Sequence, residues 1–110
     1  MLIEQKEYKE GDIIAAKLIT GEEITAKLVK VGDYGLTISK PLMITLMAGP
    51  NSTQAAVAPV PWVLAVEDDA KLVIGMDRFI FVTKARSEIV SMYTKATTGL
   101  DIPSGGFNPN

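Results

Sequence analysis

Two short turns carry the side chains whose chemistry could serve a binding site: Asp33-Tyr34-Gly35 and Gly75-Met76-Asp77-Arg78. The ring of Tyr34 could stack on a nucleobase, and the guanidinium of Arg78 could bind a phosphate. The alternative is that both segments are tight turns with solvated polar side chains, because no run of basic residues accompanies either one. The residues alone leave both interpretations open.

The composition excludes most catalytic chemistry. The 110 residues include no cysteine and no histidine, which removes thiol nucleophiles, disulfides, thiolate zinc sites and imidazole bases. The serines therefore have no histidine to activate them. We expect no enzymatic activity, no cofactor, no metal centre and no small-molecule substrate. The formal net charge of -2 provides no overall basic field that would gather nucleic acid or anionic lipid.

Two further groups of charged side chains have both a functional and a structural interpretation. Glu67-Asp68-Asp69 could bind a hard cation, but such a run is more often a solvated turn that keeps a sheet edge soluble. Lys17 and Lys27 could form a basic strip on adjacent strands. Glu22 and Glu23 are interleaved with them, which favours a mixed solvated surface.

Short strands are the elements that would position these residues. The segment from Asp12 to Met47 has the pattern of three strands, broken at Thr20-Gly21-Glu22 and at Gly32-Asp33-Tyr34-Gly35. Apolar and polar residues alternate along it, which is the period of a strand with one buried face. The residues predicted to point inward are Ile14, Ala16, Leu18, Ile24, Ala26, Leu28, Leu36, Ile38, Leu42 and Ile44.

The parity of this pattern predicts details of the pairing. The apolar residues of the first two strands lie on the same face only if the loop between the strands has an odd number of residues. We therefore expect a three-residue loop with Leu18 opposite Ile24. Gly21 supplies the left-handed conformation that such a loop needs. Pro41 has no N–H to donate, so Lys40-Pro41 marks a bulge or an edge in the third strand.

Further strands and one helix follow. A strand is expected from Val57 to Val66, and Lys71 to Lys84 contains two short apolar segments on either side of the second turn. The segment Phe79 to Val82 is apolar on both faces, which places it in a sheet interior or at a subunit interface. The period then becomes helical, with Ile89, Met92, Tyr93 and Ala96 on one face.

The predicted organisation is a lead-in of helical or extended form (1–11), a β-barrel (12–84), a helix (85–99) and a flexible tail (100–110). The fold class is mostly β: an SH3-like open barrel of five bent antiparallel strands with one C-terminal helix. The apolar runs are far shorter than the ~20 residues of a membrane span, and the start is not that of a signal peptide. We therefore expect no membrane partner and a cytoplasmic location.

The strand pattern resembles that of the Sm-like (LSm, Hfq) proteins over residues 12–84. The spacing Leu18-x-x-Gly21, followed by Ile24, Leu28 and a Gly/Asp turn before the third strand, is similar to the first motif of that family. The turn from Ile74 to Arg78 before an apolar strand is similar to the second motif. Departures are Ala26 in place of the family's glycine, and Leu36 or Thr37 in place of its base-contacting asparagine.

The resemblance implies an assembly and a ligand. Sm-like proteins pair a strand edge of one subunit with an edge of the next to close a ring, and single-stranded RNA commonly threads or wraps that ring. On this basis the expected RNA-binding residues are Asp33, Tyr34, Thr37, Gly75, Met76, Asp77 and Arg78. The alternative is an SH3-like structural module that binds proteins and no RNA.

A ring also follows from the two strand edges that an open barrel leaves unpaired. We expect these edges to be Val60 to Val66 and Phe79 to Val82, because neither carries a charge. Their aromatic residues could instead line a ligand pocket, but core or interface positions are the better interpretation. The predicted assembly is a cyclic homo-oligomer of five to seven chains. Its predicted interface residues are Val60, Trp62, Val63, Leu64, Phe79, Ile80 and Phe81.

Overall fold

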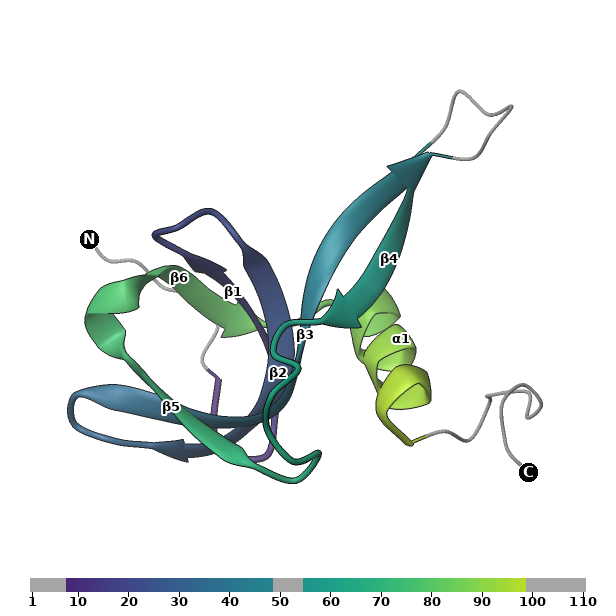
Figure 1. Ribbon diagram of the computed structural model, residues 1–110. Helices are drawn as coiled ribbons and strands as arrows, with labels where there is room; N and C mark the ends of the chain where they lie inside the picture. The colour runs from purple at the N-terminus through teal and green to yellow at the C-terminus, as the bar shows by residue number, and fades with distance from the viewer. Residues whose placement is uncertain (1–7, 49–54, 99–110) are drawn as a thin grey trace.

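The computed structural model describes residues 8–48 and 55–98, and within them it contains six strands, a 3-10 turn and one α-helix (Figure 1). In chain order the elements are β1 (Ile13–Leu18), β2 (Glu23–Val31), β3 (Gly35–Ala48), β4 (Ala55–Pro61), β5 (Lys71–Gly75), η1 (Met76–Arg78), β6 (Phe79–Lys84) and α1 (Ser87–Thr98). All strand pairs are antiparallel. The predicted tail (100–110) and most of the predicted lead-in lie outside the described residues.

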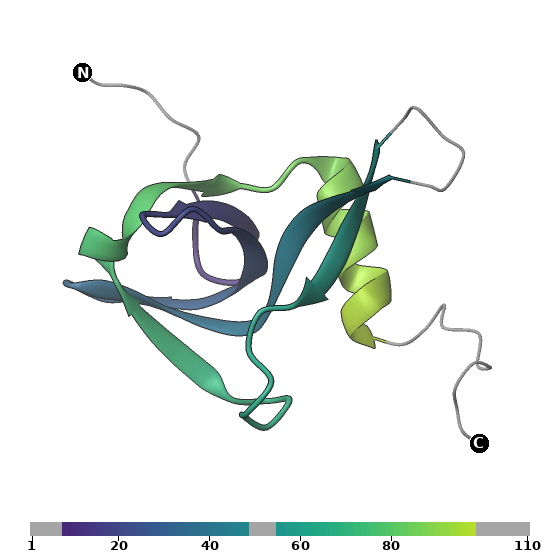
Figure 2. The same ribbon diagram turned by 45° about the horizontal axis from the view of Figure 1, so that its top comes forward.

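The predicted fold class is confirmed, with six strands in place of five. The sheet has the order β4-β3-β2-β1-β6. Strand β5 pairs with the first part of β3, and β4 pairs with the second part. Because η1 joins β5 directly to β6, the chain passes from one end of the bent sheet to the other and gives it the form of an open barrel (Figures 1 and 2).

The barrel core is the predicted apolar row. Its buried hydrophobic residues are Ile14, Ala16, Leu18, Ile24, Ala26, Leu28, Leu36 and Ile38. Leu42 and Ile44 were predicted to continue this row, but both are only partly buried. They lie beyond the point where β3 bends away from the barrel, so the core no longer covers them.

The β1–β2 loop has the predicted odd length, but its register is wrong by two residues. The loop is Ile19-Thr20-Gly21, closed by a 2.8 Å bond from the N–H of Gly21 to the carbonyl of Leu18. As a result Ile24 lies opposite Ala16 instead of Leu18. A shift of two leaves every side chain on its predicted face. Gly21 has a φ of 107°, the left-handed conformation that was predicted for it.

The predicted bulge at Lys40-Pro41 is confirmed. These two residues of β3 lie between the pairs Thr25–Leu42 and Lys27–Ser39, where β2 supplies one residue. Lys40 has a φ of 50°, which a non-glycine residue adopts rarely. Beyond the bulge, β3 pairs with β4 to form a two-stranded arm that extends from the barrel (Figures 1 and 2).

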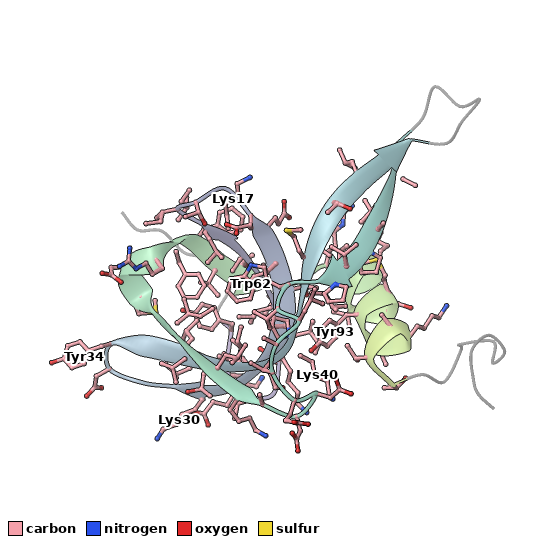
Figure 3. All side chains as sticks on the ribbon, in the orientation of Figure 1. Lys17, Lys30, Tyr34, Lys40, Trp62 and Tyr93 are labelled. Atoms are coloured by element: carbon pink, nitrogen blue, oxygen red, sulfur yellow. The ribbon has the colours of Figure 1, made fainter. Side chains whose placement is uncertain are left out.

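Helix α1 is joined to the bulge by one side chain. The Tyr93 hydroxyl accepts a 3.1 Å hydrogen bond from the N–H of Lys27 on β2. It lies 3.1 Å from the carbonyl oxygen of Ser39 and 2.9 Å from that of Lys40, and donates its proton to this pair (Figure 3). The hydroxyl therefore links β2 to β3 where the bulge disturbs their ladder. Burial raises the pKa of Tyr93 to about 12.

Candidate nucleic-acid surface and assembly edges

The fold brings the two predicted turns together into one surface, here called the two-turn surface (residues 33–35 and 75–78). The N–H of Met76 donates a 2.8 Å hydrogen bond to the carbonyl of Tyr34, and Gly35 lies opposite Gly75 in the β3–β5 ladder. A Cβ atom on Gly35 would be 2.7 Å from the carbonyl oxygen of Ile74. The approach of the two turns therefore requires glycine at position 35.

The two-turn surface exposes an aromatic ring but has little positive charge. Tyr34 is 88% exposed, and it lies at the outer end of the β2–β3 hairpin (Figure 3). Arg78 has its Nε 3.8 Å from Oδ1 of Asp77, and both side chains are solvated. With Asp33 the surface has two carboxylates and one guanidinium. Its geometry suits stacking on a base, whereas its electrostatics would attract a phosphate backbone only weakly.

Thr37 lies apart from the other predicted RNA-binding residues. It is half-buried on β3, opposite Val73 of β5 and two residues beyond Gly35. The structure therefore places six of the seven predicted residues on one surface and Thr37 on the adjoining strands.

Strands β5 and β6 are the edges that the described chain leaves open beside the two-turn surface. In the described residues β5 pairs only with β3, and β6 pairs only with β1. Phe79 and Val82 pack against the core, while Ile80 is 61% and Phe81 46% exposed. Ile80 is the extra residue of a bulge in the β1–β6 ladder. The segment predicted to be apolar on both faces is thus an edge strand, with one face on the core and the other in solvent.

The other predicted edge, Val60 to Val66, is wrong as a strand. Strand β4 ends at Pro61, because it reaches the bulge of β3, where the ladder finishes with a long 3.4 Å bond from the N–H of Trp62 to the carbonyl of Pro41. Trp62 packs against the core, Val63 is half-buried and Leu64 is 84% exposed.

The outer edge of β4 is also closed to a further strand. The Trp62–Pro41 hydrogen bond shows that the backbone N–H and C=O groups of Trp62 face β3. These groups alternate in direction along a strand, so the backbone groups of Pro59 and Pro61 face away from β3. That edge therefore lacks two donors. The edge that sequence reasoning missed is β5, where Val73 is 73% exposed. The apolar run Leu72-Val73-Ile74 was the available signal.

The two alternative charged sites do not form as compact clusters. Lys17 lies opposite Glu23 at one end of the β1–β2 ladder and Lys27 lies opposite Ile13 at the other, so they make no basic strip. Beside the acidic run, Lys40 and Lys71 donate to the backbone carbonyls of Asp68 and Asp69 at 3.4 and 3.3 Å. Among residues 8–48 and 55–98, no group of His, Cys, Asp and Glu is arranged to hold a metal ion.

One pocket lies beside the acidic run, between the bulge, the β4–β5 connection and the C-terminal end of α1. Its volume is about 220 Å3, and Leu42, Val63 and Leu72 are among its lining residues. Within the described part of the chain, no helix is long and apolar enough to cross a membrane.

The family model of the Sm_like domain matches residues 15–94. The chain belongs to the Sm-like family. The match begins in β1 and ends in α1, so it spans the barrel, the arm, the two-turn surface and both open edges. No curated protein matches the chain. Ala26, the residue that the resemblance places at the family's glycine position, is fully buried in the core.

Proposed function

We propose that this Sm-like protein assembles into a closed ring of five to seven copies by pairing β5 of one copy with β6 of the next. The observation that carries the proposal is the pair of unlike open edges, whose outward side chains Val73, Ile80 and Phe81 are exposed and apolar. Pairing them satisfies the backbone groups of both edges and covers these side chains. Because the two edges differ, the contact is head-to-tail and closes into a ring when its rotation allows.

Charge inserted at the β6 edge tests this assembly. We expect Ile80→Lys to abolish the head-to-tail contact, because a buried ammonium without a partner is strongly unfavourable at an interface. Val31→Lys is the matched control, since Val31 is also exposed but lies on β2, opposite Leu36 of β3, and on neither of the two proposed edges. Native mass spectrometry should show the ring in the control and its loss in Ile80→Lys. Equal masses for the two variants would refute the role of the β6 edge.

Single-stranded RNA is the ligand that the two-turn surface fits best, because the exposed ring of Tyr34 would be repeated around the ring. The test is fluorescence anisotropy with U-rich and A-rich oligonucleotides over a range of salt concentrations. We expect weak, salt-dependent binding that Tyr34→Ala and Arg78→Gln reduce and Arg86→Gln leaves unchanged, because Arg86 is an exposed arginine near the start of α1.

The alternative is a protein-binding assembly module without RNA. The charge balance of the two-turn surface, two carboxylates against one guanidinium, favours it. An intact ring that shows no salt-dependent affinity for either oligonucleotide would support this alternative and eliminate RNA.

A further inference from the structure

The outward face of β2, β3 and β5 carries lysines in two rows that cross the three strands. Residues directly opposite each other in a ladder share a face, and so do residues two apart on one strand. The rows are Lys27–Ser39–Lys71 and Lys30–Thr37–Val73. These six residues are here called the basic face.

The basic face is the solvent side of the sheet. Leu36 and Ile38, which alternate with its residues along β3, are fully buried in the core. The side chains of Lys27, Lys30 and Lys71 are therefore directed away from the core, and all three residues are exposed. Figure 3 shows Lys30 pointing away from the barrel.

The three ammonium groups have no acidic partner. No ion pair joins any of them to a carboxylate of the described residues. Lys71 donates a 3.3 Å hydrogen bond to the backbone carbonyl of Asp69, which leaves its charge uncompensated. Lys27 and Lys71 are separated by two strand spacings, about 10 Å, so each can meet a different anionic group. The basic face is thus a local concentration of positive charge on a chain whose net charge is -2.

The basic face adjoins the two-turn surface. Beyond the row of Thr37 and Val73, the next pair in the β3–β5 ladder is Gly35 opposite Gly75. Neither glycine has a side chain that would separate the lysines from the turn that contains Tyr34. A strand with one base stacked on Tyr34 can therefore continue across the basic face.

We propose that the basic face binds the phosphate backbone of single-stranded RNA. This inference rests on the proposed function, in which RNA is the ligand of the two-turn surface, and it supplies the positive charge that the two-turn surface lacks. Lysine ammonium groups and the hydroxyl of Thr37 are donors for phosphate oxygens. An acidic protein segment would use the same charges, but it would leave the neighbouring exposed ring of Tyr34 without a base to stack on.

Backbone contacts imply a salt dependence that is the same for every RNA sequence. On a single strand, each phosphate contact contributes about 0.7 to the slope of log affinity against log salt concentration. Loss of one lysine should therefore cost about fivefold in affinity at roughly 0.1 M salt, and loss of two should cost about 25-fold.

The test variant is Lys27→Gln with Lys30→Gln, because both residues lie on β2, which takes no part in the proposed ring contact. The matched control is Lys17→Gln with Arg86→Gln, which removes the same two charges from outside the basic face. Fluorescence anisotropy of the full-length proteins with U-rich and A-rich oligonucleotides, over a range of salt concentrations, measures affinity and slope. A polyglutamate peptide is the competing polyanion.

We expect the test variant to lose about 25-fold in affinity for both oligonucleotides, with a slope smaller by about 1.4, and the control to bind as the wild type does. Tyr34→Ala should lower the affinity without changing the slope. If the wild type binds RNA but the test variant matches the control, the basic face is overturned and the proposed RNA function stands. A wild type that binds neither oligonucleotide would overturn both. Binding of polyglutamate alone would also overturn the inference and assign the face to an acidic protein segment.

Discussion

Replacing Tyr93 by phenylalanine removes the hydroxyl that joins α1 to the bulge, and it changes little else. The N–H of Lys27 loses its 3.1 Å acceptor, and the carbonyls of Ser39 and Lys40 lose a shared donor. Tyr93 is 3% exposed, so water replaces these bonds poorly. We expect a loss of about 1–3 kcal/mol in the free energy of unfolding, the usual cost of leaving buried polar groups without partners.

The assay is thermal unfolding at a fixed protein concentration, because association between copies would otherwise shift the midpoint. For a chain of this length the entropy of unfolding is about 0.23 kcal/mol/K, which converts the expected loss into a fall of roughly 4–13 °C in Tm. Tyr34→Phe is the control, since its ring is 88% exposed. Faster hydrogen exchange at the Lys27 amide should accompany the fall. A Tm equal to that of Tyr34→Phe would refute the role of Tyr93 as the link between helix and bulge.

Two further predictions follow from the same geometry. Burial raises the pKa of Tyr93 from 10.0 to about 12, so the unfolded chain releases this proton at a lower pH than the folded chain, and stability should fall as the pH rises from 10 to about 12. Urea unfolding over this pH range should show a steeper loss of stability in the wild type than in Tyr93→Phe. Parallel pH profiles for the two proteins would contradict this prediction. Gly35→Ala places a methyl group against the carbonyl of Ile74, and we expect it to cost about 1–3 kcal/mol in urea unfolding. Gly32→Ala, with a less severe 3.1 Å contact, should cost less, and the reverse order would contradict the close approach of the two turns.

The features that were predicted correctly from the sequence are those that depend on the pattern of neighbouring residues. Alternation identified the buried face of β1, β2 and the start of β3, because a period of two has one solution when one face is buried. Pro41 marked the bulge for a similar reason, since a residue without an N–H must interrupt a ladder. The helix was found from its 3.6-residue period, and its structure spans Ser87–Thr98 within the predicted 85–99.

What the sequence could not predict depends on contacts between distant residues. The β1–β2 register was wrong by two because parity fixes faces but not the start of the loop. The end of β4 was placed five residues late, at Val66 instead of Pro61, because the apolar run continues while its partner strand bends away. The role of Tyr93 was missed as well. Helical spacing marks it as inward-facing, but only the fold shows that its hydroxyl meets the bulge, more than fifty residues away in the chain.

The measurement that tests the central claim most directly is the mass of the full-length protein at micromolar concentration, by native mass spectrometry, with Ile80→Lys alongside. The pairing of β5 with β6 predicts that the wild type forms rings of five to seven chains. It also predicts that Ile80→Lys contains no ring. A wild type that remains monomeric, or a ring that survives Ile80→Lys unchanged, would contradict the account.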